Sequence, residues 1–381
     1  MPWKETDAVE QRTEFAIRAM SKGIPFVKLC REYGISPKTG YKWKARFIEK
    51  GICGLADESR RPHNSPTQAG EDVICRVVEL KLAHRNWGPK KICELYARKE
   101  SHREPPSLST VKRILDKAGL VEGRRIRNRE SCGRIAARIE AFAPNDVWSV
   151  DFKGWWYSRA GDRIEPLTVR DNFSRYILCA KVLPDGRAGT VRRHFERLFE
   201  LNGLPGAIRS DNGPPFASER SPLGLTQLST WWVALGIDLD RITPGRPQEN
   251  GAHERMHRDI AVELESEKQD AEALELWRHE YNHERPHEAL GMKMPAEVYR
   301  KSERRFEAGD MQLKYEDGFL RRTVHCTGTI QLDGAVVRIG KAFAGWDVGA
   351  QLIEASRYAI WFGKLYLGEV DLQCESFKVV R

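Results

Sequence analysis

Three acidic residues in different parts of the sequence have the surroundings of metal ligands. Asp151 lies within the apolar stretch VWSVDF, where a carboxylate is costly unless it is paired or binds a cation. Asp211 follows a short apolar strand and precedes Asn-Gly, and Glu254 lies one turn into a helix, near the positive end of its dipole. Hard oxygen ligands suit Mg²⁺ or Mn²⁺, and two such ions about 4 Å apart catalyse in-line phosphoryl transfer.

Each carboxylate also has a purely structural interpretation. Asp151 could be salt-bridged within a core, Asp211 could be only a turn residue, and Glu254 could be only a surface acid of its helix. Glu249 is a rival for the third position. The coincidence of all three carboxylates behind a basic region favours the metal site.

The same glutamate belongs to HERMH, residues 253–257, which has the H-E-x-x-H spacing of zinc peptidases. Such a peptidase needs a third ligand further along, but Pro286 interrupts any helical spacing among the next histidines. We therefore interpret His253 and His257 as neighbours of a catalytic glutamate. A contact to DNA phosphate and a plain solvent-exposed helix face both remain open for them.

A mixed α/β domain over residues 143–302 must position these groups. The expected strands are VWSVDFKGWW, RIEPLTVRD, RYILCAKVLP and the start of GAIRSDNGPPF. The expected helices are GRAGTVRRHFERLFELNG, LTQLSTWWVALG and a longer one from near Asn250 through HERMHRDIAVELESEKQ. In this pattern Asp146 and Asp171 fall at a strand edge and in a turn, and we expect them to be structural.

Positive charge is concentrated in the first third of the chain. Residues 1–138 hold 30 Lys and Arg against 17 Asp and Glu, a net charge of +13, whereas the remainder carries −4. This part is therefore expected to face a polyanion. Residues 123–142 form an Arg-rich linker that contains Arg124, Arg125, Arg127 and Arg129. These arginines could contact phosphates along a DNA duplex, or the segment could be only a solvated linker.

Two helical domains are expected before that linker. Residues 1–55 divide into three helices, the third beginning at Ser36-Pro37, which indicates a helix-turn-helix. Its third helix would enter a major groove with Thr39, Lys42 and Arg46, and the candidate DNA contacts there are Lys38, Thr39, Lys42, Lys44 and Arg46. A structural three-helix bundle is the alternative. After a linker over 56–70, residues 71–122 repeat the pattern, with Ser107 or Ser109 as the last N-cap.

The end of the chain is predicted to be all-β. Residues 308–381 contain strands with glycine turns, typical of a small barrel or sandwich. Its role is open between an accessory contact to DNA or another protomer and a purely structural part.

Composition excludes several classes of protein. No apolar run reaches the roughly 18 residues of a membrane span, and the first residues lack a signal-peptide pattern, so we expect an intracellular protein without a membrane partner. The eight cysteines include no C-x-x-C pair, which argues against a zinc ribbon and a disulfide framework.

The three carboxylate motifs resemble one known family. DVWSVDF with Asp151, SDNGPPF with Asp211 and PQENGAHERMHR with Glu254 are similar to the motifs of bacterial insertion-sequence transposases, whose retroviral-integrase-type core is RNase H-like. NHERPHEALGMKMPAEVY (282–299) looks like the segment that closes such cores. Asn212, Asn250, Arg255 and His257 accompany the motifs as supporting residues. The chain departs from the family in the 42 residues between Asp211 and Glu254, against roughly 35 in many relatives.

The resemblance implies a function. Asp151, Asp211 and Glu254 would hold two Mg²⁺ or Mn²⁺ ions, cleave the terminal inverted repeats of an element and join the 3′-hydroxyls to target DNA. Two ends must be brought together, so at least a dimer on DNA is expected. The alternatives are a non-catalytic DNA-binding regulator of the element and, more remotely, the zinc peptidase.

Overall fold

The structure is a computed structural model, and it consists of two compact units, residues 1–68 and 69–381. The residues that it describes are 7–21, 23–58, 69–121, 139–219, 221–243, 246–307, 309, 313–354, 356–373 and 376–379. The candidate phosphate contacts Arg124, Arg125, Arg127 and Arg129 lie outside these ranges, as does most of the expected linker over 56–70. No helix among the described residues is long and apolar enough to cross a membrane.

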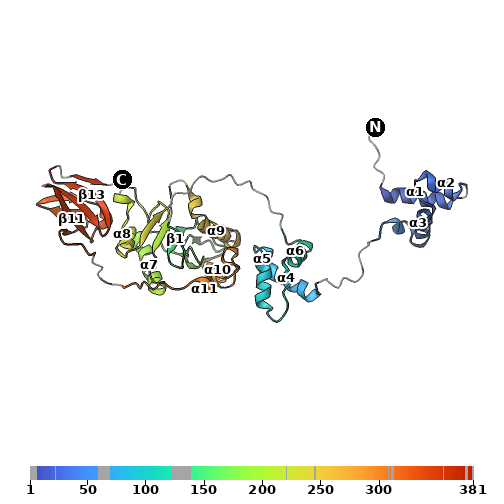
Figure 1. Ribbon diagram of the computed structural model, residues 1–381, viewed down its shortest axis with the longest axis horizontal. Helices are drawn as coiled ribbons and strands as arrows, with labels where there is room; N and C mark the ends of the chain where they lie inside the picture. Colours follow the sequence, from blue (N-terminus) through green and yellow to red (C-terminus); the bar gives the residue numbers. More distant parts are fainter. Residues whose placement is uncertain are drawn as a thin grey trace, which may run out of the picture. The chain divides into compact units, whose positions relative to one another are not determined.

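The first helical module (residues 7–58) contains the three expected helices and a short 3₁₀ turn. These are α1 (Ala8–Met20), α2 (Phe26–Glu32), α3 (Pro37–Lys50) and η1 (Gly51–Leu55) (Figure 1). The Ser36 hydroxyl accepts the backbone N–H of Thr39 at 3.2 Å and so caps α3 as predicted. A methyl group at Gly40 would lie 2.6 Å from the Cys30 sulfur, so α2 and α3 approach closely only because residue 40 is glycine.

The second helical module (residues 69–121) repeats this pattern with α4 (Glu71–Ala83), α5 (Pro89–Lys99) and α6 (Leu108–Lys117). The N-cap of α6 is Ser107, whose hydroxyl accepts the Thr110 N–H at 3.2 Å, which decides between the two serines. Trp87, Ile92 and Tyr96 lie in its buried core. The module therefore folds around apolar side chains of its own.

A mixed five-stranded sheet forms the centre of the second unit, in the order β5-β4-β1-β6-β7. The strands are β1 (Val147–Phe152), β4 (Pro166–Asp171), β5 (Ile177–Val182), β6 (Ala207–Ser210) and β7 (Asp238–Arg241). β1 is antiparallel to β4 and parallel to β6, and β6 is parallel to β7. The helices are α7 (Ala188–Asn202), α8 (Gln227–Ala234), α9 (Gly251–Ile260), α10 (Ala271–His283) and α11 (Pro295–Val298).

Helices cover both faces of this sheet, each over its own apolar cluster (Figure 1). Trp148 and Val150 of β1 belong to the cluster that contains residues of α7 and α8. Met256 of α9 and Trp277 of α10 lie in the other cluster, with Ile177 of β5. Because side chains alternate along a strand, Asp151 faces the α9 side.

Three predictions for this domain were wrong in detail. The first strand ends at Phe152, and Trp156–Tyr157 form a separate strand, β2, paired with β3 (Arg163–Ile164). β7 was not predicted. The helix that begins at Gly251 changes to a π-helical turn over Ala261–Glu265 and ends there, short of the expected Gln269.

The all-β prediction for the end of the chain is correct. One antiparallel sheet consists, in this order, of β14 (Ser376–Val379), β13 (Leu365–Asp371), β12 (Arg357–Phe362), β11 (Asp347–Glu354) and β8 (Leu320–Thr323). A separate hairpin pairs β9 (Thr329–Leu332) with β10 (Ala335–Arg338). Leu225, which precedes α8, lies in the same apolar cluster as the core of this domain. The β domain therefore packs against the central domain near α8.

Candidate active site

The parallel pairing of β1 with β6 brings Asp151 and Asp211 to the same edge of the sheet. Ser149 of β1 pairs with Arg209 of β6. Continued for two residues, this register places Asp211 beside Asp151, at the carboxyl ends of both strands. Two local patterns that are far apart in the sequence thus meet through strand pairing.

The electrostatic surroundings of Asp151 disfavour its negative charge. The pKa of Asp151 is raised to about 7, mainly by burial and also by the charges of Asp211 and Glu254, while a hydrogen bond from the Phe152 N–H acts in the opposite direction. The side chain is 32% exposed, so solvent still reaches it. A cation bound among the three carboxylates would relieve this repulsion.

One oxygen of Asp211 has no hydrogen-bond partner. Oδ1 is buried and unpartnered within the part of the chain that the structure describes. A methyl group at Gly213 would lie 3.0 Å from Oδ2, so glycine leaves this carboxylate room. The neighbouring Asn212 donates its amide to the Ile242 carbonyl oxygen at 2.6 Å and so holds the loop after β6. A buried orphan carboxylate oxygen is the expected state of a ligand without its metal.

The third carboxylate lies in the first turn of α9, as predicted. Glu254 is partly exposed there, and Asn250 just before the helix is buried. The buried Arg170 of β4 donates to the Ala252 carbonyl oxygen, which ties the first turn of α9 to the sheet. Arg255 is exposed, with its Nε 3.7 Å from an Asp259 oxygen. Of the supporting residues, Asn250 is therefore part of the packed structure and Arg255 faces solvent.

The other acids considered in the sequence have structural partners. Glu249 is 6% exposed, and its Oε2 accepts the backbone N–H of Thr243 at 2.7 Å. Asp171 accepts the N–H and the hydroxyl of Ser174. Asp146 accepts two backbone N–H groups at 2.8 Å. These contacts favour Glu254 over Glu249 as the third carboxylate of the site.

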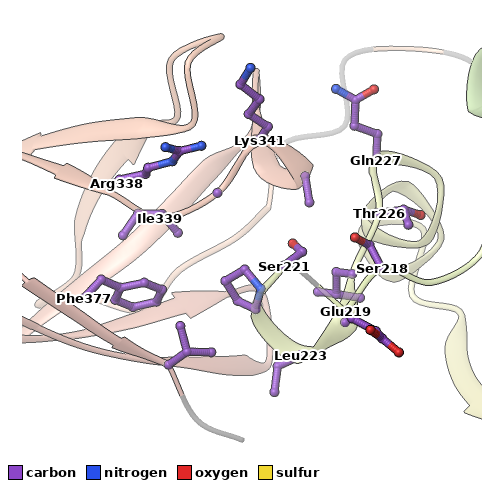
Figure 2. A pocket seen from close by; sticks show the side chains of 16 residues that line it. Ser218, Glu219, Ser221, Leu223, Thr226, Gln227, Arg338, Ile339, Lys341 and Phe377 are labelled. Carbon is purple, nitrogen blue, oxygen red and sulfur yellow. The ribbon is translucent and has the colours of Figure 1, made fainter. Parts of the chain in front are cut away.

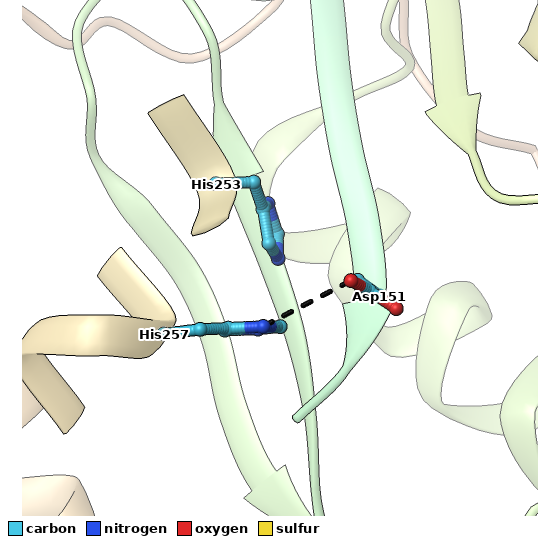
Figure 3. A group of neighbouring side chains, drawn as sticks. All are labelled: Asp151, His253 and His257. Atoms are coloured by element: carbon cyan, nitrogen blue, oxygen red, sulfur yellow. Dashed lines mark ion pairs between the residues drawn. The ribbon is translucent and has the colours of Figure 1, made fainter. Parts of the chain in front are cut away.

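His253 and His257 face the sheet, so their interpretation as an exposed helix face was wrong. His253 is fully buried and the His257 side chain is 14% exposed. Both rings point from α9 toward Asp151 (Figure 3). Both rings bond through Nε2 to the hydroxyl of Thr168, at 2.8 and 2.7 Å. Burial lowers the pKa of His257 to about 4, helped by the charges of Lys153 and Arg170, and lowers that of His253 as well.

Sequence reasoning missed Thr168. It lies on β4 directly opposite Asp151, and its hydroxyl donates to the Asp151 carbonyl oxygen at 2.9 Å. The only signal in the sequence is a polar residue between the apolar residues Leu167 and Val169. A strand pairing must be known before that residue can be placed beside the histidines.

The candidate DNA contacts of the first module lie on or beside α3. Lys38 and Lys42 are exposed, and Thr39 is partly occupied in capping, since its N–H and hydroxyl both contact Ser36. Arg46 pairs with Glu58 at 2.8 Å. Lys42, Lys44 and Arg46 each place their charge over an aromatic ring, at 4.8, 5.6 and 5.3 Å from its centre. Lys38 and Lys42 are the most accessible of the set.

Helix α5 of the second module is joined to the central domain by ion pairs. Lys90 pairs with Glu288 and Arg98 with Glu297, at 2.8 and 2.7 Å. Two further pairs join the second module to the central domain: His84 with Glu280 at 2.8 Å and Lys99 with Glu284 at 3.5 Å. Basic residues of the second module thus contact protein, and its α6 carries exposed Lys112, Arg113 and Lys117.

A hollow of about 1060 Å³ lies between the loop that precedes α8 and the β domain (Figure 2). Arg338 and Lys341 line it on one side, and Ser218, Glu219 and Gln227 on the other. None of the three candidate metal ligands lines it. The hollow is therefore separate from the candidate active site.

Models of known families match most of the chain. Residues 141–247 and 235–295 each match an integrase core domain, residues 11–63 a helix-turn-helix domain and residues 39–115 a homeodomain-like domain. Residues 321–378 match the C-terminal domain of IS481 family transposases.

Similar proteins come from bacterial insertion elements. A 31.7 kDa protein of insertion element IS407 from Burkholderia multivorans is 30% identical over 267 residues, 67% of this chain and 91% of the relative. A 39.2 kDa protein of IS476 from Xanthomonas euvesicatoria is 29% identical over 254 residues, 65% of this chain and 70% of the relative. The HTLV-2 integrase catalytic core domain in complex with magnesium is 15% identical, with a TM-score of 0.32, over 42% of this chain and 100% of that one.

Three findings agree with the resemblance of the three carboxylate motifs. They are the matches to integrase core domains, the match of residues 321–378 to the C-terminal domain of IS481 family transposases, and the similarity to the IS407 protein over nearly its whole length. The chain belongs to the bacterial insertion-sequence transposases with an integrase-type core.

Proposed function

We propose that this transposase cuts the ends of its element and joins them to target DNA at a site formed by Asp151, Asp211 and Glu254. The observation that carries the proposal is the arrangement of these groups at one sheet edge. Burial, together with the charges of Asp211 and Glu254, raises the pKa of Asp151, and Asp211 has a buried oxygen that has no hydrogen-bond partner among the described residues. Both features are typical of a metal site.

The donor set fits Mg²⁺ or Mn²⁺. Carboxylate oxygens are the ligands that these ions accept, and Asp151, Asp211 and Glu254 would hold two of them. When bound, such a pair activates the attacking oxygen and stabilises the leaving oxygen of an in-line displacement.

The chain itself supplies position and rigidity. Strand pairing fixes the spacing of Asp151 and Asp211, and the Arg170 contact with Ala252 fixes the start of α9 and with it Glu254. A rigid first turn matters because a displacement of about 1 Å at a catalytic group can cost about a hundredfold in rate. Arg170 is therefore proposed as a residue that positions Glu254.

DNA is the proposed partner of both helical modules and of the basic stretch with Arg124, Arg125, Arg127 and Arg129. The first module would read the terminal inverted repeat with α3, through Lys38 and Lys42 above all. Because two element ends must be joined, we propose that the chain acts as at least a dimer on DNA.

Cleavage of a labelled element end tests the proposal. Asp151→Asn, Asp211→Asn and Glu254→Gln should each abolish cleavage in Mg²⁺ or Mn²⁺, while binding to the same DNA stays within about threefold, because none of these residues lies in a helical module. A single variant that still cuts removes its residue from the site. A wild-type protein that binds the end and never cuts under either ion supports the regulator instead.

A further inference from the structure

The hydroxyl of Thr168 fixes the tautomer of both histidines next to Asp151. Its oxygen lies 2.9 Å from the Asp151 carbonyl oxygen, 2.8 Å from His253 Nε2 and 2.7 Å from His257 Nε2. A carbonyl oxygen can only accept, so the single hydroxyl proton goes to Asp151. The hydroxyl then accepts from both rings, and each histidine carries its proton on Nε2.

This assignment leaves Nδ1 of His257 as a bare lone pair that faces the Asp151 carboxylate. The atoms concerned, His257 Nδ1 and Asp151 Oδ2, lie 3.8 Å apart (Figure 3). That distance exceeds the range of a hydrogen bond, about 2.7–3.2 Å. A cation bound between these two acceptors would satisfy both of them.

The separation fits a metal ion. Zinc bonds to imidazole nitrogen at about 2.0–2.1 Å and to carboxylate oxygen at about 2.0–2.2 Å, so the two bonds together span up to about 4.3 Å. A gap of 3.8 Å corresponds to a bent nitrogen–metal–oxygen angle. The ligand atoms of Asp151, His253 and His257 all lie within 4.8 Å of one another, and buried His253 Nδ1 has no hydrogen-bond partner within the described part of the chain.

We propose that His257 is a nitrogen ligand in this site, and that with Asp151 it binds a divalent ion that accepts imidazole, of which Zn²⁺ is the type. Oxygen ligands alone select Mg²⁺ or Mn²⁺, whereas an imidazole favours later transition metals. Thr168 acts as the outer partner that receives the second N–H of the ligating ring. This inference rests on the proposed function only in that Asp151 is a metal ligand.

Zn²⁺ titration by calorimetry on the metal-free full chain, with excess Mg²⁺ present, tests the inference. We expect one Zn²⁺ site that Mg²⁺ does not displace. His257→Asn and Asp151→Asn should each weaken it at least about tenfold, because each removes one ligand. Thr168→Val should weaken it about 10- to 100-fold and Thr168→Ser should restore it, since serine keeps the hydroxyl.

Two variants serve as matched controls at other groups that could bind Zn²⁺. His279 and His283 also stand four residues apart on a helix, with ring centres 4.5 Å apart, and Cys326 lies 3.5 Å from His325 Nδ1. His279→Asn and Cys326→Ser should leave the high-affinity site unchanged. Thermal melts of every variant identify any that has lost its fold.

The possible outcomes separate this inference from the proposed function. A folded His257→Asn protein that binds Zn²⁺ as tightly as the wild type, or binding lost in a control variant instead, overturns the nitrogen ligand. Failure of the wild type to cut DNA would overturn the proposed function and leave the Zn²⁺ result standing. Normal cutting in Mg²⁺ together with unchanged Zn²⁺ affinity in His257→Asn would overturn the inference alone.

Discussion

The two helical modules have the same order of helices but differ in how they are connected to the rest of the chain. The first module forms a compact unit separate from residues 69–381. The second module belongs to the larger unit, where four of its basic residues pair with glutamates of the central domain at Glu280, Glu284, Glu288 and Glu297. Positive charge in a helix-turn-helix therefore does not by itself identify a DNA-reading surface.

This difference suggests that the two modules have different roles in DNA binding. The first module keeps exposed lysines on α3, and we expect it to supply most of the affinity for the element end. In the second module, α6 carries the exposed basic residues Lys112, Arg113 and Lys117, and none of these takes part in the ion pairs with the central domain described above. We expect this module to hold the bound end at a set distance from the active site.

Charge reversal on α3 should have the largest effect. Lys42→Glu in the full chain is expected to weaken binding to the element end at least about tenfold and to reduce the salt dependence, because a phosphate contact is replaced by repulsion. Lys90→Glu on α5 is the matched control, and should change affinity by less than about threefold. Equal losses in a gel-shift titration would show that both helices face DNA.

Breaking the ion pairs of α5 should have a moderate effect. Arg98→Glu places like charges opposite one another at Glu297, and the double variant with Glu297→Arg restores attraction. Exposed pairs contribute about 0–1 kcal/mol each, so we expect faster hydrogen exchange in α5 for the single variant and recovery in the double variant. Exchange that is unchanged in both variants would contradict a stabilising role for this pair.

A pH-dependent effect is expected at Lys91 of α5. The pKa of Lys91 is lowered to about 8, mainly by burial and secondly by repulsion from the charge of Arg285. A lysine with a depressed pKa binds fewer protons when folded than when unfolded, so stability rises as the pH increases from about 8 to about 10.5.

Lys91→Met should therefore stabilise the protein near neutral pH, by an amount on the order of 1 kcal/mol, and the gain should shrink above about pH 9. Thermal melts of both proteins across this range measure the difference. A gain that does not depend on pH would assign the effect to packing rather than to charge.

The sequence predicted what depends on local pattern. The neighbouring residues alone were enough to predict that Asp151 lies within a strand, Asp211 directly after a strand and Glu254 in the first turn of a helix. The caps at Ser36 and Ser107 are of the same kind. For the same reason, the order of the domains was correct.

What the sequence did not predict depends on distant pairing. Thr168 acquires its position from β1, 17 residues away, and from histidines 85 and 89 residues away. The glutamates that pair with His84, Lys90 and Arg98 of the second module lie nearly 200 residues further along the chain. β7 has the polar sequence DLDR and forms at the edge of the sheet because β6 offers it a partner, with Arg209 and Asp240 2.7 Å apart.

A strand-transfer assay tests the central claim most directly. Purified protein, an oligonucleotide of the element end and a plasmid target are combined in Mg²⁺ or Mn²⁺, for the wild type, Glu254→Gln and Glu249→Gln. Glu249 is the matched control, since it lies on the same segment and its carboxylate is engaged with Thr243. We predict joined products for the wild type and Glu249→Gln and at least about a hundredfold loss for Glu254→Gln. Joining by Glu254→Gln at the wild-type level would contradict the account.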